Sequence, residues 1–279
     1  MGRKLTYIFL FLLALLVCYP FVFILTGSFM SGAEAKAYLL PMITGGDGYV
    51  NWRLIPMMPT LKHYVELLLD SPEFFSMFWN SFKIVGCILA GQLLAGVPAA
   101  WALAKLKLPF KKLIFMIYII LMMMPFQVTM LSNYLVLDQL KLLDTHAAII
   151  LPAVFSTFPV FIMHRFFVSV PDGIIEAAKI DGAGDIMTFL YVGVPLGSSG
   201  IISAVILSFL EYWNLIEQPL AFLKTKSLWP LSLYLSNISI ERSGFAFTAS
   251  VIAFIPALLV FLSGQDYLEK GIVASALKG

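Results

Sequence analysis

The stretch Ser169–Gly200, SVPDGIIEAAKIDGAGDIMTFLYVGVPLGSSG, is a polar island between two strongly apolar segments. Pro171 stops a helix that arrives from upstream, because proline lacks a backbone N–H and restricts the residue before it. Asp172 can then cap a new helix by accepting backbone N–H groups of its first turn. Residues 176–180 are good helix formers, and Gly182 stands where a helix usually ends in a left-handed residue. The island therefore predicts a short helix outside the apolar segments.

The composition indicates a polytopic membrane protein. Of the 279 residues, 60% are hydrophobic and 12% are charged, and the mean hydropathy is +0.92. Soluble domains are about half apolar and about a quarter charged. The net charge of +2 comes with no basic, aromatic-rich patch of the kind that binds nucleic acid. Cys18 and Cys87 both lie in apolar runs, so no disulfide framework is indicated.

Six apolar runs predict membrane spans, for which a helix needs about 20 residues. They cover residues 5–30, 84–104, 113–130, 147–163, 196–210 and 245–263. The first run resembles a secretory signal in its charged start, but its length of about 25 residues exceeds the 7–15 of a signal core. We therefore expect an uncleaved first span and one all-α transmembrane domain over residues 1–279, with six helices.

A lysine-rich loop sets the expected topology. It contains Lys105, Lys107, Lys111 and Lys112, and cytoplasmic loops carry the excess of Lys and Arg. Six spans then place this loop, the island and both termini in the cytoplasm, with residues 31–73 and 214–244 outside. In the first outer segment, Thr60 can cap a short helix over residues 61–69. That helix would lie on the membrane surface or contact an external partner.

The island also carries a spaced motif: Glu176-Ala177-Ala178, three residues, Gly182, nine residues and Val192-Gly193-Val194-Pro195. This order resembles the permease subunits of ABC importers, in which Ile and Leu stand at the positions of Val192 and Val194. The sequence Asp181-Gly182-Ala183 and the terminus at 271–279 resemble the carbohydrate-uptake, maltose-permease-like branch. Glu-Ala-Ala alone is a weak signal in an alanine-rich helix, but the spacing to Pro195 between two spans makes it specific.

The resemblance implies a permease that translocates a sugar or oligosaccharide by alternating access. It implies four kinds of partner: a second homologous permease, two ATPase subunits, an external solute-binding protein and the lipid of a bacterial or archaeal inner membrane. The short helix would seat in a cleft of an ATPase subunit. The residues expected to couple the permease to that subunit are Glu176, Ala177, Ala178, Asp181, Gly182 and Pro195. The tail at 265–279 would reach between the ATPases, and the segment 214–244 would face the binding protein.

No enzyme or cofactor motif is readable in the chain. It lacks Gly-x4-Gly-Lys-Ser/Thr, which cradles ATP phosphates, so ATP and Mg are expected on the partner subunits. Gly182-Ala183-Gly184 begins like a dinucleotide fingerprint, but Met187 replaces the third glycine and no strand precedes it. His63, His146 and His164 are far apart in sequence, and we predict no metal site.

Mildly polar residues in the apolar runs are candidates for a path that a neutral hydroxylated solute would follow. These residues are Gln92, Gln127, Ser156, Thr157 and Ser208. Helix–helix contact by polar groups is the alternative for each of them. Ionisable residues deep in a span would indicate an ion path, but Lys83 and Glu211 lie near span ends. This argues against the main alternative function, an ion-coupled secondary carrier for a small polar solute.

Overall fold

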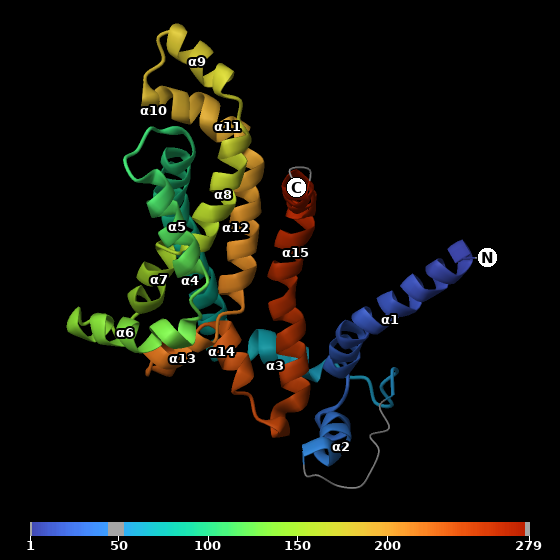
Figure 1. Ribbon diagram of the computed structural model, residues 1–279. Coiled ribbons are helices and arrows are strands. Elements are labelled where there is room, and N and C mark those ends of the chain that lie inside the picture. Colours follow the sequence, from blue (N-terminus) through green and yellow to red (C-terminus); the bar gives the residue numbers. More distant parts are fainter. Residues whose placement is uncertain (1, 44–52, 277–279) are drawn as a thin grey trace. The chain divides into compact units, whose positions relative to one another are not determined.

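The computed structural model describes residues 2–43 and 53–276, where the regular structure is helical and contains no strand (Figure 1). The expected all-α fold is confirmed. The chain forms two compact units. Unit 1 comprises Met1–Phe78 and Tyr234–Pro256, and unit 2 comprises Trp79–Leu233 and Ala257–Gly279.

Four helical segments of the described chain are long and apolar enough to cross a membrane. They are Lys4–Ser28, Pro72–Lys105, Ala147–Ser169 and Ile240–Glu269. Two further pairs meet the same criteria but are bent, Lys111–Met122 with Phe126–Gln139 by 100° and Asp185–Leu196 with Ser198–Trp213 by 70°. The fold is therefore that of a polytopic membrane protein, and it reaches the expected six spans if each bent pair is one span.

Unit 1 combines α1 (Gly2–Ser28), α2 (Gly32–Ile43) and α3 (Lys62–Leu69) with the first turns of α4 (Pro72–Lys105) and α15 (Ser243–Ala276). The helix α3 lies where the short helix over 61–69 is expected, and the Thr60 hydroxyl oxygen accepts the Lys62 N–H at 3.1 Å. The hydroxyls of Ser28 and Tyr64 are hydrogen-bonded at 2.8 Å. The Thr248 hydroxyl donates to the Ser28 carbonyl at 3.3 Å, so α1, α3 and α15 are joined within this unit.

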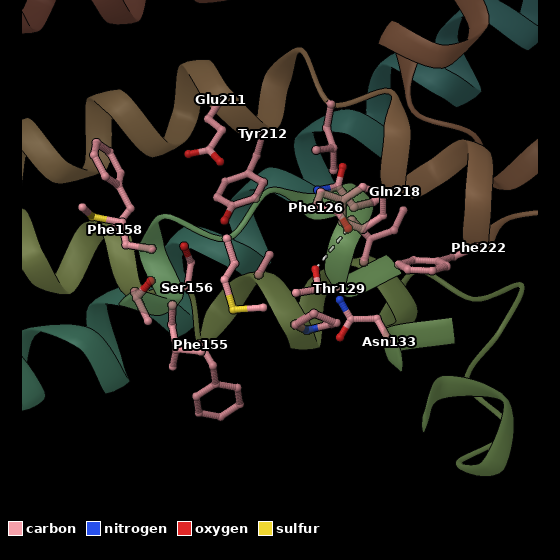
Figure 2. A pocket seen from close by; sticks show the side chains of 18 of the residues that line it. Phe126, Thr129, Asn133, Phe155, Ser156, Phe158, Glu211, Tyr212, Gln218 and Phe222 are labelled. Atoms are coloured by element: carbon pink, nitrogen blue, oxygen red, sulfur yellow. Dashed lines mark hydrogen bonds between the residues drawn. The ribbon is translucent and has the colours of Figure 1, made fainter. Parts of the chain in front are cut away.

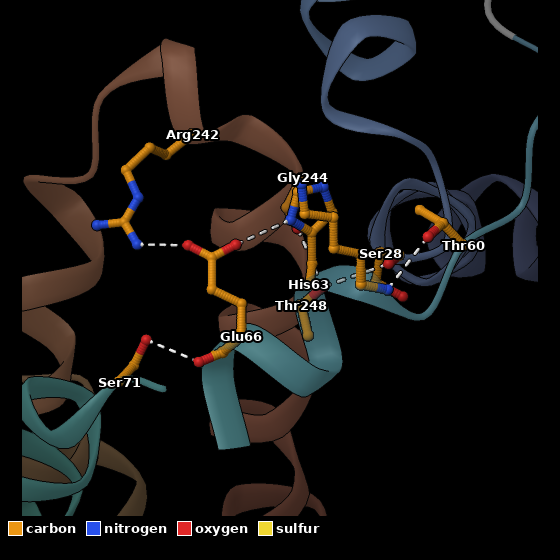
Figure 3. A network of polar contacts seen from close by, with 9 residues as sticks. Ser28, Thr60, His63, Glu66, Ser71, Arg242, Gly244 and Thr248 are labelled. Atoms are coloured by element: carbon orange, nitrogen blue, oxygen red, sulfur yellow. Dashed lines mark hydrogen bonds and ion pairs between the residues drawn. The ribbon is translucent and has the colours of Figure 1, made fainter. Parts of the chain in front are cut away.

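A polar network around Glu66 holds the other end of α3 (Figure 3). One carboxylate oxygen of Glu66 lies 2.9 Å from the Arg242 guanidinium, and the other lies 3.5 Å from Nδ1 of His63. The Ser71 hydroxyl donates to the Glu66 carbonyl at 2.9 Å. A Cβ at Gly244 would come within 2.3 Å of the His63 ring, so glycine allows α15 to approach α3 at this point.

Unit 2 is built around α4, α8 (Thr157–Ser169) and α12 (Ser198–Trp213). The buried core of this bundle consists of Val97, Ala100, Trp101, Leu103, Val160, Met163, Phe167 and Ala204. The rings of Trp101 and Phe167 meet edge-on at a centroid distance of 5.3 Å, a favoured arrangement for aromatic pairs. Below the bundle in Figure 1, α6 (Phe126–Gln139) and α13 (Glu217–Phe222) lie at the opposite end of this unit from α9 (Asp172–Ile180).

The run expected as one span over 113–130 is divided between α5 (Lys111–Met122) and α6. Pro125 precedes α6 with ψ 148°, an extended value, and the two helix axes diverge by 100°. Proline lacks the N–H that would continue the helical hydrogen bonding. A second interruption, at Ser156 with ψ 137°, separates α7 (Ala147–Val154) from α8. These two helices together still form one candidate span, Ala147–Ser169.

Close approach of α12 and the preceding turn to α8 depends on two glycines. A Cβ at Gly197 would lie 2.2 Å from the Phe167 ring, and one at Gly200 would lie 2.4 Å from Phe166. Neither distance is compatible with a side chain unless the ring moves. The segment after α10 (Asp185–Thr188) is therefore packed tightly on the bundle through the π-helical turn Phe189–Gly193 and α11 (Val194–Leu196).

Gly197→Ala should lower the melting temperature of the purified chain, because overpacking a well-packed contact costs about 1–3 kcal/mol. Gly86→Ala is the matched control, since a Cβ at Gly86 in α4 meets nothing within 4 Å and alanine favours the helix. Thermal unfolding followed by intrinsic fluorescence in detergent measures both variants. Equal melting temperatures for Gly197→Ala and the wild type would contradict the packing described here.

Candidate functional site

The short helix of the island is α9, which the structure ends in a Schellman motif. The Ala183 N–H donates to the Ala178 carbonyl at 3.0 Å, and the Gly182 N–H donates to the Lys179 carbonyl at 3.1 Å. Gly182 has φ +87°, the left-handed conformation expected for it from the sequence. The end of α9 is thus determined by local sequence. The left-handed Gly182 turns the chain so that its own N–H and that of Ala183 bind two of the last free carbonyls of the helix.

The expectation that Asp172 caps α9 is wrong. Pro171 occupies the cap position, Asp172 is the first helical residue, and no side chain caps the helix. The Asp172 carboxylate instead pairs with the Lys105 ammonium at 2.6 Å, which also donates to the Val170 carbonyl at 2.6 Å. The hydrogen bond and charge of Lys105 hold the pKa of the Asp172 carboxyl below its ordinary value. Lys105, at the end of α4, therefore binds both sides of the turn that connects α8 to α9.

The inner side of the island packs on the bundle core. Ile175 from α9, Phe189 from the π-helical turn and Val194 from α11 are partly buried against the core that contains Trp101 and Phe167. Together with the Lys105–Asp172 pair, these contacts connect α9 to α4, α8 and α12. A displacement of α9 would therefore be transmitted to those three helices.

The outer side of the island exposes both polar and apolar residues. Of the residues expected to act in coupling, Glu176, Ala177, Asp181, Gly182 and Pro195 are exposed and Ala178 is half-buried. Pro195 lies in α11, beyond the π-helical turn. Ile180 is 86% exposed, and Ile186 of α10 is 75% exposed. We call Glu176, Ala177, Ile180, Asp181 and Ile186 the docking surface. Exposed apolar side chains beside charged residues make this surface a candidate for contact with a partner.

The isoleucines of the docking surface were missed in reading the motif from the sequence. The signal that could identify them is that each is an apolar residue directly beside an aspartate, Ile180 before Asp181 and Ile186 after Asp185, at the two ends of the turn between α9 and α10. Lys179 and Asp185 form an ion pair at 2.9 Å that links α9 to α10. Since both side chains are about half exposed, this pair positions the two helices more than it stabilises them.

Glu176 also lines a lysine-rich hollow of about 630 Å³ between α9 and the loop after α4. The hollow contains Lys105, Lys107, Lys111 and Lys179 among its lining residues. Lys105 and Lys179 have ion-pair partners, whereas Lys111 donates to the Ala104 carbonyl at 2.7 Å. Glu176 therefore lies in a net positive environment of its own chain.

A cavity of about 480 Å³ lies at the bend between α5 and α6 and continues along α8, α12 and α13 (Figure 2). Its volume falls in the range of small-molecule sites, about 300–1,000 Å³. Aromatic rings contribute much of the wall: Phe126, Phe155, Phe158, Phe222 and the ring of Tyr212. The polar lining residues are Thr129, Asn133, Ser156, Thr157, Glu211 and Gln218. The mixture of rings and hydrogen-bonding groups suits a hydroxylated ring compound.

Of the residues expected to line a solute path, only Ser156 and Thr157 line this cavity. The buried Gln92 amide donates to the Ala153 carbonyl at 2.9 Å. The Gln127 amide donates to both carboxylate oxygens of Glu217 at 2.9 Å. Ser208 is fully buried in α12. These three side chains therefore do not line the cavity, because the two amides are hydrogen-bonded to other groups and the serine is buried in its helix.

The cavity end of unit 2 is braced by Asp144. Its carboxylate accepts the backbone N–H groups of Lys224 and Thr225 at 2.8 Å and the Thr225 hydroxyl at 2.6 Å. The hydroxyl bond is the main reason why the pKa of Asp144 lies below its ordinary value. The Asn80 amide donates to the carbonyls of Ser227 and Trp229 at 2.8 and 3.2 Å. The loop after α13 is thus held in a defined conformation.

Comparison with known proteins decides the family. Residues 92–274 match the model of the binding-protein-dependent transport system inner membrane component, which covers more than half of the chain. The chain belongs to this family. The resemblance to the permease subunits of ABC importers is thereby confirmed, and the family role is that of a membrane-embedded transport component.

Curated relatives match this permease along nearly its whole length. One is the sulfoquinovosyl glycerol transport system permease protein SmoH of Agrobacterium fabrum, 29% identical, with 100% of this chain and 95% of that protein covered. Another is the arabinooligosaccharides transport system permease protein AraQ of Bacillus subtilis, 25% identical, with 98% and 94% covered. Both relatives are named as permeases of transport systems.

A solved structure has the same fold as this permease. It is that of a bacterial ABC transporter involved in the import of the acidic polysaccharide alginate, with a TM-score of 0.80 and 23% identity. The match covers 95% of this chain and 96% of the other.

Among the residues that the structure describes, no three His, Cys, Asp or Glu side chains come together as they would around a metal ion.

Proposed function

We propose that this permease translocates a sugar or oligosaccharide into a bacterial or archaeal cell. An external solute-binding protein would deliver the solute, and two ATPase subunits would drive transport. A second homologous permease would complete the membrane pathway. The observation that carries the proposal is the exposed docking surface, which is fastened through Lys105 and Ile175 to the helices that line a cavity.

The proposed mechanism is a rigid-body movement. When two ATPase subunits close on ATP, each pulls the docking surface of the permease seated on it. Because Ile175, Phe189 and Val194 pack on the core, α9 carries α4, α8 and α12 with it. The helices α8 and α12 contribute Phe158 and Tyr212 to the cavity wall. Movement of α9 therefore changes the shape of the cavity and its access from the two sides of the membrane.

The sequence of the chain indicates which subunits of the proposed transporter bind ATP. It has no P-loop, so in this proposal ATP and Mg bind to the ATPase subunits and the permease itself hydrolyses no ATP. The tail from 265 would reach between these subunits. The braced loop after α13 lies at the end of unit 2 opposite α9 and would meet the solute-binding protein.

The names of the relatives favour a carbohydrate or glycoside as solute. An ion-coupled secondary carrier remains the alternative class, but it would have no use for a docking surface. Co-purification in mild detergent tests the proposal. We expect an ATPase subunit and a second, similar permease to accompany the tagged chain. Purification of the chain alone, with full transport activity, would contradict the proposal.

The proposed topology places both termini, the lysine loop and α9 in the cytoplasm. Cysteines substituted singly for Lys107 and Lys179 should resist a membrane-impermeant thiol reagent on intact cells, whereas one at Lys226 should react. The lysine loop belongs inside because translocated loops carry few basic residues. Permeabilised cells provide the control in which all three positions react. External labelling at Lys179 would refute the topology and, with it, the coupling role of α9.

A further inference from the structure

The cavity in unit 2 is lined by one acidic side chain and no basic one. Among its nineteen lining residues, Glu211 is the one ionisable carboxylate, and none is Lys, Arg or His. Glu211 belongs to the last turn of α12 and is exposed, and Figure 2 shows its side chain on the cavity wall beside Tyr212. No lysine, arginine or histidine lines the cavity to pair with this carboxyl group. The cavity wall therefore has one acidic side chain without a basic partner among the lining residues.

The other polar groups of the wall are neutral. Figure 2 shows Thr129 and Asn133 of α6 on the side of the cavity away from Glu211, and Ser156 near the Tyr212 hydroxyl. The Thr129 hydroxyl donates to the Phe126 carbonyl at 3.1 Å, which leaves its lone pairs for a solute. Hydroxyls of a sugar can donate to the Glu211 carboxylate and exchange hydrogen bonds with the amides of Asn133 and Gln218. Aromatic rings such as Phe155 offer faces for the apolar side of the sugar ring.

We propose that Glu211 is ionised in this cavity and makes the permease selective for uncharged saccharides over solutes that carry a sulfonate, phosphate or carboxylate. A second anion in a partly desolvated cavity is repelled by Glu211, and discrimination between similar solutes commonly depends on such an unfavourable contact. Family membership alone does not decide the charge of the solute, because one relative is named for neutral arabinooligosaccharides and another for an anionic sulfoquinovosyl glycoside. This inference rests on the proposed function.

Charge-selective thiol labelling tests the field of the cavity directly. The background is the assembled complex in detergent, without nucleotide, with the exposed cysteines removed as Cys18→Ser and Cys87→Ser. The reporter is Ser156→Cys, with Asn133→Cys as an independent second position. Each is reacted with two methanethiosulfonates of similar size, one carrying trimethylammonium and the other a sulfonate. The ratio of the two rates is compared with that for free 2-mercaptoethanol.

With Glu211 present, the cation-to-anion ratio should exceed the free-thiol ratio by roughly fivefold to tenfold at Ser156→Cys, as expected for one nearby unit charge, and by less at Asn133→Cys on the far side of the cavity. Glu211→Gln should return the ratio to the free-thiol value, and Glu211→Lys should reverse the preference. An equal ratio in the wild-type and Glu211→Gln backgrounds would overturn the inference. So would absence of reaction at both reporter positions, because the cavity would then not be open to solutes.

The outcome can be separated from the test of transport, because labelling requires neither ATP nor a sugar. A cation-preferring cavity in a complex that imports no sugar with ATP would refute the proposed function and leave the charge assignment in place. ATP-driven uptake of sulfoquinovosyl glycerol by the reconstituted wild-type complex would refute the selectivity and leave the proposed function in place.

Discussion

Glu176→Lys should reduce reconstituted uptake at least tenfold at matched protein level. Glu176 is exposed on α9 and lies beside a hollow lined by Lys105, Lys107, Lys111 and Lys179. A lysine there adds a fifth positive charge around the hollow and reverses the charge that residue 176 presents on the docking surface. Like charges juxtaposed at an interface cost on the order of several kcal/mol. The ATPase subunits should bind weakly, or hydrolyse ATP without stimulation by the loaded binding protein.

Two controls isolate the sign of the charge. Glu176→Gln removes the charge without reversing it, and it should lose less uptake than Glu176→Lys. Reversal of a basic residue in the ATPase cleft should restore part of the Glu176→Lys defect, which a loop without a docking role would not show. Glu176 lies outside the apolar runs, so insertion and protein level should stay near normal. Uptake equal to the wild type in Glu176→Lys would contradict a docking role for this residue.

Gly182→Val should impair coupling by a different route. Gly182 has φ +87°, and the left-handed conformation costs a side-chain-bearing residue roughly 1–2 kcal/mol, more for a β-branched one. A Cβ at this position meets nothing within 4 Å, so the effect is conformational and not steric crowding. Loss of the Schellman bonds from Gly182 and Ala183 would change the path from α9 to α10. We expect uptake and stimulated ATP hydrolysis to fall together.

Gly184→Val is the matched control for this prediction. A Cβ at Gly184 also meets nothing within 4 Å, but its φ of −69° and ψ of 168° are extended values that valine adopts readily. The control should therefore transport nearly as well as the wild type. If both valine variants transport equally, the left-handed turn at Gly182 has no part in coupling.

Local sequence rules predict most of the fold and part of the island. The apolar runs predict a polytopic helical protein, because most of them approach or exceed the length of about 20 residues that crosses a bilayer. The end of α9 at Gly182 follows from a glycine placed after good helix formers. Asp172 is different: the local rule makes it a cap, but Lys105, which is 67 positions earlier in the chain, takes its carboxylate. Contacts of this range are invisible to a pattern read along the chain.

The bend at Pro125 and the cavity beside it were hidden for a related reason. Hydropathy depends on how many residues are apolar and does not show where a helix bends. The apolar run over 113–130 therefore predicts one straight span, whereas α5 and α6 diverge by 100° within it. Polarity within a run also does not reveal which side chains are already engaged. Gln92 and Gln127 form hydrogen bonds to groups 61 and 90 positions away, whereas Asn133 and Gln218 lie outside the predicted spans and line the cavity.

Transport in proteoliposomes tests the central claim most directly. The vesicles contain this permease, its second permease and the ATPase subunits, with ATP enclosed and the binding protein outside with the sugar that it holds. The account predicts uptake that requires both ATP hydrolysis and the binding protein, and no uptake when a proton or sodium gradient replaces ATP. Gradient-driven uptake by this chain alone, without ATP or the other subunits, would contradict the account.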